Sequence, residues 1–353
     1  MKKLISALAA VTASLFLFAA CSAQVVLPLD PNWTDNGNVA AAAGFSETLT
    51  YGVSFEKGEL SNLTIEVGEG SSYVMQTSVL ESYPAPDGNN YAVYVLRSEL
   101  TLRGAFVNEA GTAIARFGMS GDDTVDPPDT LTTTVWFHSL DGGRNLRPIR
   151  SETSGYFHAV DSTSGSALVL TNYTATIEYN NSASTANVNL TNRWTEEELS
   201  KENAVIDDYT VRSSLPRTQT FTIKDLQKNY SGFDAGQLYF VGRGISYSEN
   251  SSNTLTLASL YGKVQCGVSC SEFADLSCNF TVTGRETPVT TVNTARVTFT
   301  NRGNGQNTGP SRTVNYARAT DSSSGYYNVP VRIAETFAYD MGDIVFTLQS
   351  VVR

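Results

Sequence analysis

The sequence predicts an all-β protein: a large curled antiparallel sheet, barrel-like or folded as a sandwich, with one or two short helices. Three observations support this fold class. Apolar residues alternate with polar or small ones along most of the chain after Glu47, which is typical of strands with one buried face. Clusters of Gly, Asn and Asp separate these runs, as turns do. The runs amount to about a dozen strands, too many for one flat sheet.

Within the domain, each expected element follows from its local pattern. Leu49 and Tyr51 alternate with polar residues in the first strand. Two short helices are expected, because Thr195–Glu198 has the spacing of a capping box, and Asp234–Gly244 has an Asp cap, Gln237 three residues later and a terminal Gly. Further alternating runs begin at Leu63, Tyr94, Val169, Val329 and Ile344.

The composition and net charge argue against several classes of function. The chain has 353 residues, 41% of them hydrophobic and only 17% charged, and its formal net charge is −11. Because nucleic-acid binding needs a basic surface that neutralises phosphates, we expect no nucleic-acid partner. Two His and four Cys leave little material for metal or nucleophile chemistry. We therefore expect no catalytic residue, no metal centre and no cofactor.

The first residues have the pattern of an export signal. Lys2 and Lys3 precede an uninterrupted run of small and apolar residues over 4–20, and Cys21 follows this run. We expect residues 1–20 to be a signal peptide that is removed. The end of the run, Phe-Ala-Ala followed by Cys21, resembles the lipobox of bacterial lipoproteins.

This resemblance implies that the Cys21 thiol receives diacylglycerol and that the chain is cut just before it. The protein would then be exported and lipid-anchored, to the outer face of the bacterial cell membrane or to the outer membrane. Ordinary cleavage after Ala23 and an uncleaved anchor are the alternatives. Residues 21–43, with two prolines and several turn formers, would be the lipidated Cys and a flexible tether. Residues 44–353 would be the antiparallel β domain. The alternative is that this domain consists of two subdomains that meet near 195–215.

Three segments, in order along the chain, resemble an uncharacterised family of exported bacterial β proteins. They are the alternating run Glu47–Phe55, the segment Leu146–Ser151 with its Pro148, and the segment Asp234–Phe240. The resemblance implies a single curled antiparallel sheet over most of residues 44–353. It implies no activity.

Three cysteines lie close together near the C-terminal third. Cys266, Cys270 and Cys278 have the spacing C-x3-C-x7-C. If Cys21 is lipidated, an odd number of thiols remains, and an exported protein then favours one disulfide and one free Cys. Three free thiols and a metal site are the alternatives, although the spacing matches no common zinc ribbon. Which pair would form a disulfide is not fixed by the spacing.

Trp136 and His138 are the candidate ligand face. In a strand they lie on one side, with Val135 and Phe137 on the other. If Val135 and Phe137 fill the core, Trp136 and His138 line the opposite surface, which could be concave and could hold a sugar ring or a lipid. The alternative is a hydrogen-bonded His on an ordinary sheet.

A loop over 120–129 carries four Asp residues. Clustered carboxylates suit Ca²⁺, but their order does not fit an EF-hand, so a solvated hairpin loop is favoured. Our leading hypothesis is a non-enzymatic, membrane-anchored envelope lipoprotein whose β domain binds a lipid, glycan or protein ligand or has a structural role. A carrier for lipid or lipoprotein that uses a concave sheet is the alternative, and a secreted glycan-active enzyme ranks third.

Overall fold

A computed structural model confirms the all-β fold with a large curled sheet. It describes residues 25–26, 45–59, 63–124, 126–138, 146–160, 168–192, 205–206, 209–211, 218–226, 232–245, 247–303, 306–318, 325–337 and 341–353. Within these residues the strands form one 18-stranded sheet and a separate three-stranded sheet. A 3₁₀ turn and one six-residue α-helix complete the described elements.

The bounds of the elements follow the alternating runs. The first half contains β1 (Val25–Val26), β2 (Ser46–Lys57), β3 (Leu63–Val67), β4 (Ser72–Pro84), β5 (Asn90–Leu102), β6 (Gly104–Asn108), β7 (Ala113–Phe117), β8 (Asp129–His138), β9 (Pro148–Val160), β10 (Leu168–Asn180) and β11 (Thr185–Asn192). The second half contains β12 (Val205–Ile206), β13 (Tyr209–Val211), β14 (Thr218–Ile223), β15 (Gly232–Asp234), η1 (Ala235–Gln237), α5 (Leu238–Arg243), β16 (Ser251–Ser259), β17 (Gly262–Val282), β18 (Val289–Gly303), β19 (Gln306–Ala317), β20 (Pro330–Thr336) and β21 (Gly342–Val352).

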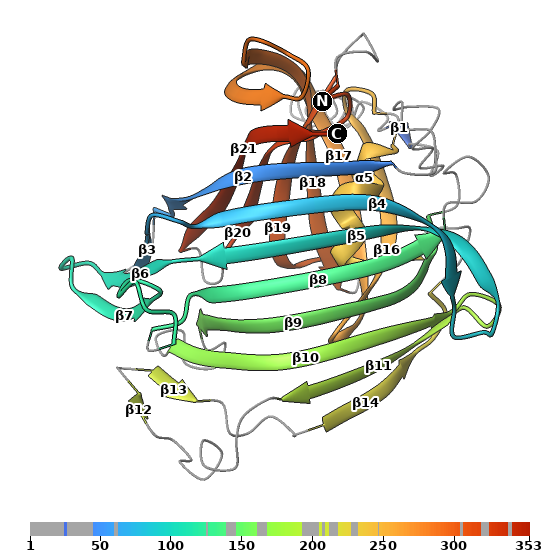
Figure 1. Ribbon diagram of the computed structural model, residues 1–353, viewed down its shortest axis with the longest axis horizontal. Coiled ribbons are helices and arrows are strands. Elements are labelled where there is room, and N and C mark those ends of the chain that lie inside the picture. Colours follow the sequence, from blue (N-terminus) through green and yellow to red (C-terminus); the bar gives the residue numbers. More distant parts are fainter. Residues whose placement is uncertain are drawn as a thin grey trace, which may run out of the picture.

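The main sheet follows one antiparallel path. Its hydrogen-bonded order is β14–β11–β10–β9–β8–β5–β4–β2–β21–β20–β19–β18–β17–β16. Four pairings are parallel: β1 and β15 with β16, β13 with β10, and the end of β17 with β21. The sheet is therefore mixed, with antiparallel pairing predominant. The small sheet, β3–β6–β7, projects from one side (Figure 1).

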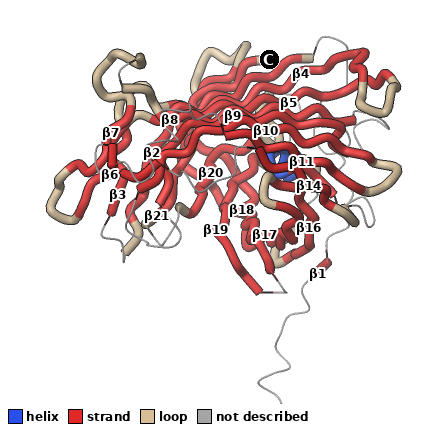
Figure 2. The backbone as a smooth tube through the Cα atoms, turned by 90° about the horizontal axis from the view of Figure 1, so that it is seen from below, coloured by secondary structure: helices blue, strands red, loops and turns tan. Residues whose placement is uncertain are grey.

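The long strand β17 explains how the sheet turns back on itself. It is 21 residues long and pairs with β18 through two register shifts, which bend a strand. Its last residues then pair with β21, Thr281 opposite Ser350. Strands β2, β4, β5 and β8–β11 cross the front of the view, and α5 lies behind them with β16–β20 (Figure 1). Figure 2 shows the helix enclosed between these two parts of the curled sheet.

The enclosed helix confirms the element expected over Asp234–Gly244. Asp234 caps it, its side chain accepting from the Gly236 backbone N–H at 2.7 Å, and the Gln237 side chain accepts from the Asp234 N–H at 3.0 Å. All six residues of α5 are buried. The ring of Phe240 lies 5.1 Å from that of Phe137, so the inward face of β8 packs directly on the helix.

A buried ion pair joins the helix to the first long strand. The side chains of Glu47 and Arg243 are 0% and 1% exposed, and their closest atoms are 2.5 Å apart. Arg353 adds a second guanidinium at 2.7 Å from the same carboxylate. Burial alone would raise the pKa of Glu47, but the two arginines outweigh it and hold that pKa below its ordinary value.

Several predictions about domain organisation fall wholly or partly on residues outside the described part. These are the signal peptide over 1–20, Cys21 and the helix at Thr195–Glu198. Val25 and Val26, inside the expected tether, pair with the start of β16. On either side of the expected boundary near 195–215, β11 pairs with β14, and the division into two subdomains stays a prediction. None of the helices among the described residues is long and apolar enough to cross a membrane.

Candidate functional site

The concave side of the sheet contains two neighbouring cavities. The larger, about 380 Å³, lies between the inward faces of β8, β9 and β10 and the turn η1 with strand β16. The smaller, about 180 Å³, lies nearer the small sheet. Well-packed protein interiors hold few voids larger than a water molecule. Small-molecule pockets begin at roughly 300 Å³, so the larger cavity is in the range of a binding site.

On β8, β9 and β10 the walls of the larger cavity come from residues of one parity. On β8 these are Leu131 and Thr133, which share a face with the buried Val135. Ile177 on β10 and Leu257 on β16 add apolar surface from opposite sides. Most of the lining is therefore apolar, with a few hydroxyl groups. Tyr261, which is 84% exposed in the β16–β17 turn, also lines it and marks its opening to solvent.

Among the described residues that line this cavity, Arg312 is the one cation. Arg312 projects from β19 on the side of the strand that also carries the buried Val314 and Tyr316. The carboxylate of Glu335, opposite it on β20, lies 3.5 Å from the Arg312 guanidinium. Burial opposes the charge on Arg312, but the Glu335 carboxylate outweighs this effect and raises the pKa of Arg312. The cavity thus has a permanently charged group on an otherwise mostly apolar wall.

Asp234 also lines the larger cavity, but its carboxylate is committed to other bonds. It accepts from the Gly236 backbone at 2.7 Å and from the Tyr179 hydroxyl at 2.5 Å. Burial raises the pKa of Asp234. Its role is to hold the helix start against β10, and Arg312 is left as the cation that a ligand in this cavity would meet.

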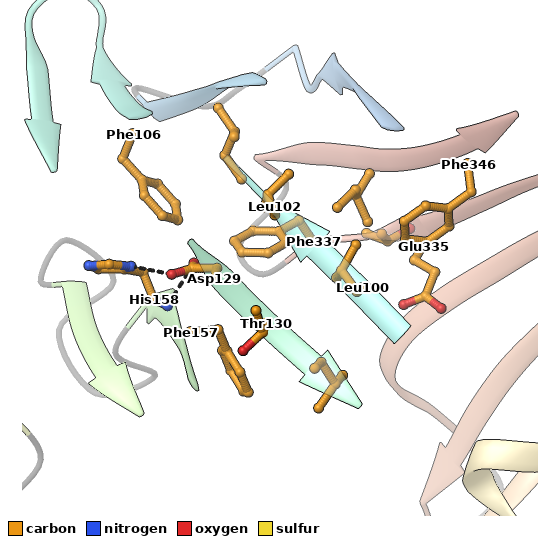
Figure 3. Close-up of a pocket in the computed structure, with 14 residues that line it drawn as sticks. Leu100, Leu102, Phe106, Asp129, Thr130, Phe157, His158, Glu335, Phe337 and Phe346 are labelled. Carbon is orange, nitrogen blue, oxygen red and sulfur yellow. Dashed lines mark hydrogen bonds and ion pairs between the residues drawn. The ribbon is translucent and has the colours of Figure 1, made fainter. Parts of the chain in front are cut away.

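The smaller cavity is more apolar and contains a buried His–Asp pair (Figure 3). Phe106, Phe337 and Phe346 supply much of its wall. The Nδ1 atom of His158 lies 2.7 Å from a carboxylate oxygen of Asp129, and the His158 backbone N–H donates to the other oxygen at 2.9 Å. Burial raises the pKa of Asp129. This pair fixes the start of β8 to the end of β9.

The two cavities share a border that includes side chains. Leu131 lines both of them, and the Arg312–Glu335 pair has one member in each. The rings of Phe157 and Tyr173 meet edge to face, 6.2 Å apart. Both rings close over position 155, where a glycine leaves room for them, since an added Cβ would lie 2.7 Å from the Tyr173 ring. Side chains that can rotate therefore form part of this border.

The predicted ligand face, Trp136 and His138, lies on the other side of β8. Val135 and Phe137 are fully buried in the core, as the alternation predicts. Trp136 stacks on Tyr83 with ring centroids 5.7 Å apart, on the face turned away from α5. This is the outer face of the curled sheet, on the side of β8 opposite the two cavities described above. Their role in binding stays a prediction.

His138 borders a polar hollow of about 300 Å³ on that outer face. Its ring packs on the edge of Tyr91 at 4.6 Å, and its Nδ1 has no hydrogen-bond partner among the described residues. Burial, and then the positive charge of Arg147, lower the pKa of His138. The hollow is lined by polar groups that include Asp87 and Glu178. The hollow beside the surface that sequence reasoning singled out is thus mostly polar.

The disulfide considered for the C-terminal cysteines is absent. Cys266, Cys270 and Cys278 are all free thiols. All three lie on the single strand β17, where four residues span about 13 Å. A disulfide needs Cα atoms within about 7 Å, so an extended strand keeps its own cysteines apart. Burial raises the pKa of Cys266 and of Cys270 to about 11, which leaves both thiols protonated and unreactive.

The acidic loop over 120–129 uses its carboxylates within the fold. Asp126 accepts from the backbone N–H groups of Met119 and Ser120 at 2.7 and 2.8 Å. Asp123 pairs with both terminal nitrogens of Arg103 at 2.8 and 2.9 Å. Among the described residues, no group of three or more potential metal ligands lies together. The carboxylates described here therefore organise the loop itself.

Comparisons with known proteins assign no activity to these sites. No family model and no curated protein matches the chain. A solved β-barrel-like protein of the domain of unknown function DUF1849, from Brucella abortus, is similar over 89% of this chain and 98% of its own, at 10% identity and a TM-score of 0.46. An exported protein with a YmcC-like fold, from Bacteroides fragilis, is similar over 90% and 98%, at 7% identity and a TM-score of 0.23. These are distant similarities to β proteins of unassigned function, and we base no argument on them.

Proposed function

We propose that this protein is an exported, lipid-anchored, non-enzymatic binding protein that holds an apolar small molecule inside its curled sheet. The observation that carries the proposal is the cavity of about 380 Å³ between β8–β10 and η1–β16. Its walls are mostly apolar, it opens beside an exposed tyrosine, and a second apolar cavity adjoins it. Burial of an apolar ligand there would remove apolar surface from water on both partners.

The alternation of the strands makes the cavity a consequence of the fold. Large inward side chains fill the space beside α5, where Phe137 and Phe240 meet. Further along β8 and β9 the inward residues become smaller, Thr133 and Thr153. Beside Thr133 and Thr153 the space between the strands and the opposite wall is therefore left open. This change along the same strands is what favours a ligand site over a purely structural sheet.

The anchor is proposed from the residues before the domain. The apolar run over 4–20 and Cys21 after it have the pattern of a lipoprotein signal. Metabolic labelling with a radioactive fatty acid tests this directly. We expect label on the wild-type chain and none on Cys21→Ser. Equal labelling of both chains, or none on either, would overturn lipidation at Cys21.

The ligand site is tested with N-phenyl-1-naphthylamine, an uncharged apolar fluorophore. Thr153 lines the larger cavity, whereas the next residue, Ser154, has the opposite parity on β9. We expect saturable binding to the wild type, binding at least about tenfold weaker for Thr153→Phe, and unchanged binding for Ser154→Phe, the matched control. Fluorescence that does not saturate, or equal affinity in all three proteins, would exclude this cavity as the site.

A further inference from the structure

The residues around the larger cavity also point to the chemical class of its ligand. We propose that the cavity binds a single-chain aliphatic carboxylate, with the carboxylate on Arg312 and the chain along the apolar wall toward Leu131. This inference rests on the proposed function and deepens it. The observation behind it is one guanidinium among mostly apolar and hydroxyl groups in the lining of the larger cavity, as far as the structure describes that lining.

Arg312 is built into the cavity wall rather than placed on the surface. It shares the inward face of β19 with Val314 and Tyr316, both buried. A guanidinium presents several N–H donors in a plane and binds carboxylates strongly. Among the described residues, its ion pair is with Glu335, whose carboxylate lies 3.5 Å from Arg312 Nε, which is long for a charge-assisted hydrogen bond. Donors of Arg312 are therefore available to a second carboxylate.

Glu335 would remain stabilised when a ligand engages Arg312. The Tyr239 hydroxyl donates to the Glu335 carboxylate from helix α5. Arg312 can thus be shared between Glu335 and a ligand without leaving Glu335 unpartnered. Such an arrangement favours a ligand with one negative charge, because the Glu335 carboxylate would repel a doubly charged ligand more strongly.

The other charged group of the cavity does not favour a cationic ligand. Asp234 already accepts hydrogen bonds from Gly236 and Tyr179, so its carboxylate oxygens are engaged within the fold. The hydroxyl groups of Thr133 and Thr153 lie 3.4 Å from each other on adjacent strands and can serve a polar head or remain paired. The donors of Arg312 that do not contact Glu335 therefore favour an anionic head.

Three probes with one chain length separate head group from chain: dodecanoate, dodecan-1-ol and dodecylamine, each titrated calorimetrically below its critical micelle concentration. A hydrogen bond to a charged partner supports a preference of at least about tenfold. We expect wild type to bind dodecanoate at least about tenfold more tightly than dodecan-1-ol, and dodecylamine most weakly.

Variants then locate the head group. We expect Arg312→Met to lower dodecanoate affinity to that of dodecan-1-ol. The double variant Arg312→Met/Glu335→Gln removes the carboxylate that Arg312→Met leaves unpaired, and we expect the same loss from it, with a cooperative thermal transition retained. Arg296→Met is the matched control, because Arg296 is 54% exposed and pairs with Glu272 on the outer face of the same sheet; dodecanoate affinity should not change.

The outcomes distinguish the proposed ligand site from the proposed carboxylate head group. If dodecan-1-ol and dodecanoate bind equally well, and Arg312→Met and the double variant change neither, the cavity is a ligand site and the carboxylate assignment is wrong. If dodecylamine binds most tightly, the carboxylate assignment is also wrong. If none of the three probes binds the wild type, the proposed function itself fails.

Discussion

The two faces of strand β8 carry different chemistry within one run of ten residues. Inward, Leu131 and Thr133 line the larger cavity, and Phe137 packs against helix α5. Outward, Trp136 stacks on a neighbouring aromatic ring and His138 borders a polar hollow. Period-two alternation therefore creates two candidate surfaces at once. The inner cavity is mostly apolar and can retain an apolar molecule, whereas the outer hollow is mostly polar.

The largest expected effect comes from breaking the buried charge network of the inner side. We expect Glu47→Ala to lower the free energy of unfolding by about 3–5 kcal/mol, because it leaves Arg243 buried without its carboxylate. The outer-face control is Glu152→Ala. Glu152 is about half exposed and pairs with Arg150 at 2.7 Å, so we expect at most about 1 kcal/mol. Urea denaturation measures both, and equal losses would contradict the distinction between the faces.

The same network predicts a pH dependence. The pKa of Glu47 is below its ordinary value in the folded state. Such a carboxylate contributes its full stabilisation above its unfolded pKa, about 4.3. The contribution is lost as pH falls through the depressed folded pKa. The wild type should therefore lose stability below about pH 4.3 more steeply than Glu47→Gln does, and parallel curves from urea melts would contradict this.

A second prediction concerns the cap of the inner helix. We expect Asp234→Ala to lower the free energy of unfolding by about 2–3 kcal/mol, since it removes an N-cap acceptor and the partner of the buried Tyr179 hydroxyl. Thermal and urea denaturation both report it. In the double variant Asp234→Ala/Tyr179→Phe, part of the loss should be recovered. A double variant as unstable as the sum of the two single changes would argue against this coupling.

The partition between the cavities offers a third test. An added Cβ at Gly155 would lie 2.7 Å from the ring of Tyr173 and 3.0 Å from that of Phe157. We expect Gly155→Ala to cost about 1–3 kcal/mol, as overpacking does. It should also change the affinity for N-phenyl-1-naphthylamine by at least about threefold, because 1 kcal/mol is roughly a factor of five in binding. Unchanged stability together with unchanged affinity would mean that the two rings do not form a tight partition.

The smallest effect is expected on the outer face. The pKa of His138 is lowered by burial and by Arg147, so the unfolded chain binds the proton more tightly. Stability is then complete above the unfolded pKa, about 6.5, and declines as pH falls below it. His138→Leu should remove this decline between pH 6.5 and 5 and leave stability at pH 7.5 nearly unchanged. A decline of the same size in the variant would assign it to other groups.

The sequence could predict features that depend on a few consecutive residues. Alternation predicts which side of β8 is buried, because a strand fixes the faces of neighbouring residues. The capping residues Asp234 and Gln237 predict the helix, because their bonds span only three positions. Both kinds of signal are contained in a few consecutive residues.

Features that depend on strand register could not be predicted in the same way. Arg312 and Glu335 face each other because β19 pairs with β20 in one register, and a shift by one residue would turn one of them outward. A signal was present, since each lies at a position whose neighbours of equal parity are apolar, Val314 and Ile333 among them. The disulfide expected among the three cysteines shows the opposite case. Their nearness in sequence indicated a disulfide, but one extended strand separates them.

The most direct test of a ligand inside the curled sheet is native mass spectrometry. The chain from Ser22 to Arg353, expressed without the signal and the lipidated Cys, would be purified without detergent and measured beside the same chain with Thr153→Phe added. We predict extra mass from an apolar molecule on the first protein, released on denaturation and strongly reduced by Thr153→Phe. A bare polypeptide mass for both proteins, even after incubation with excess dodecanoate and dodecan-1-ol, would contradict the account.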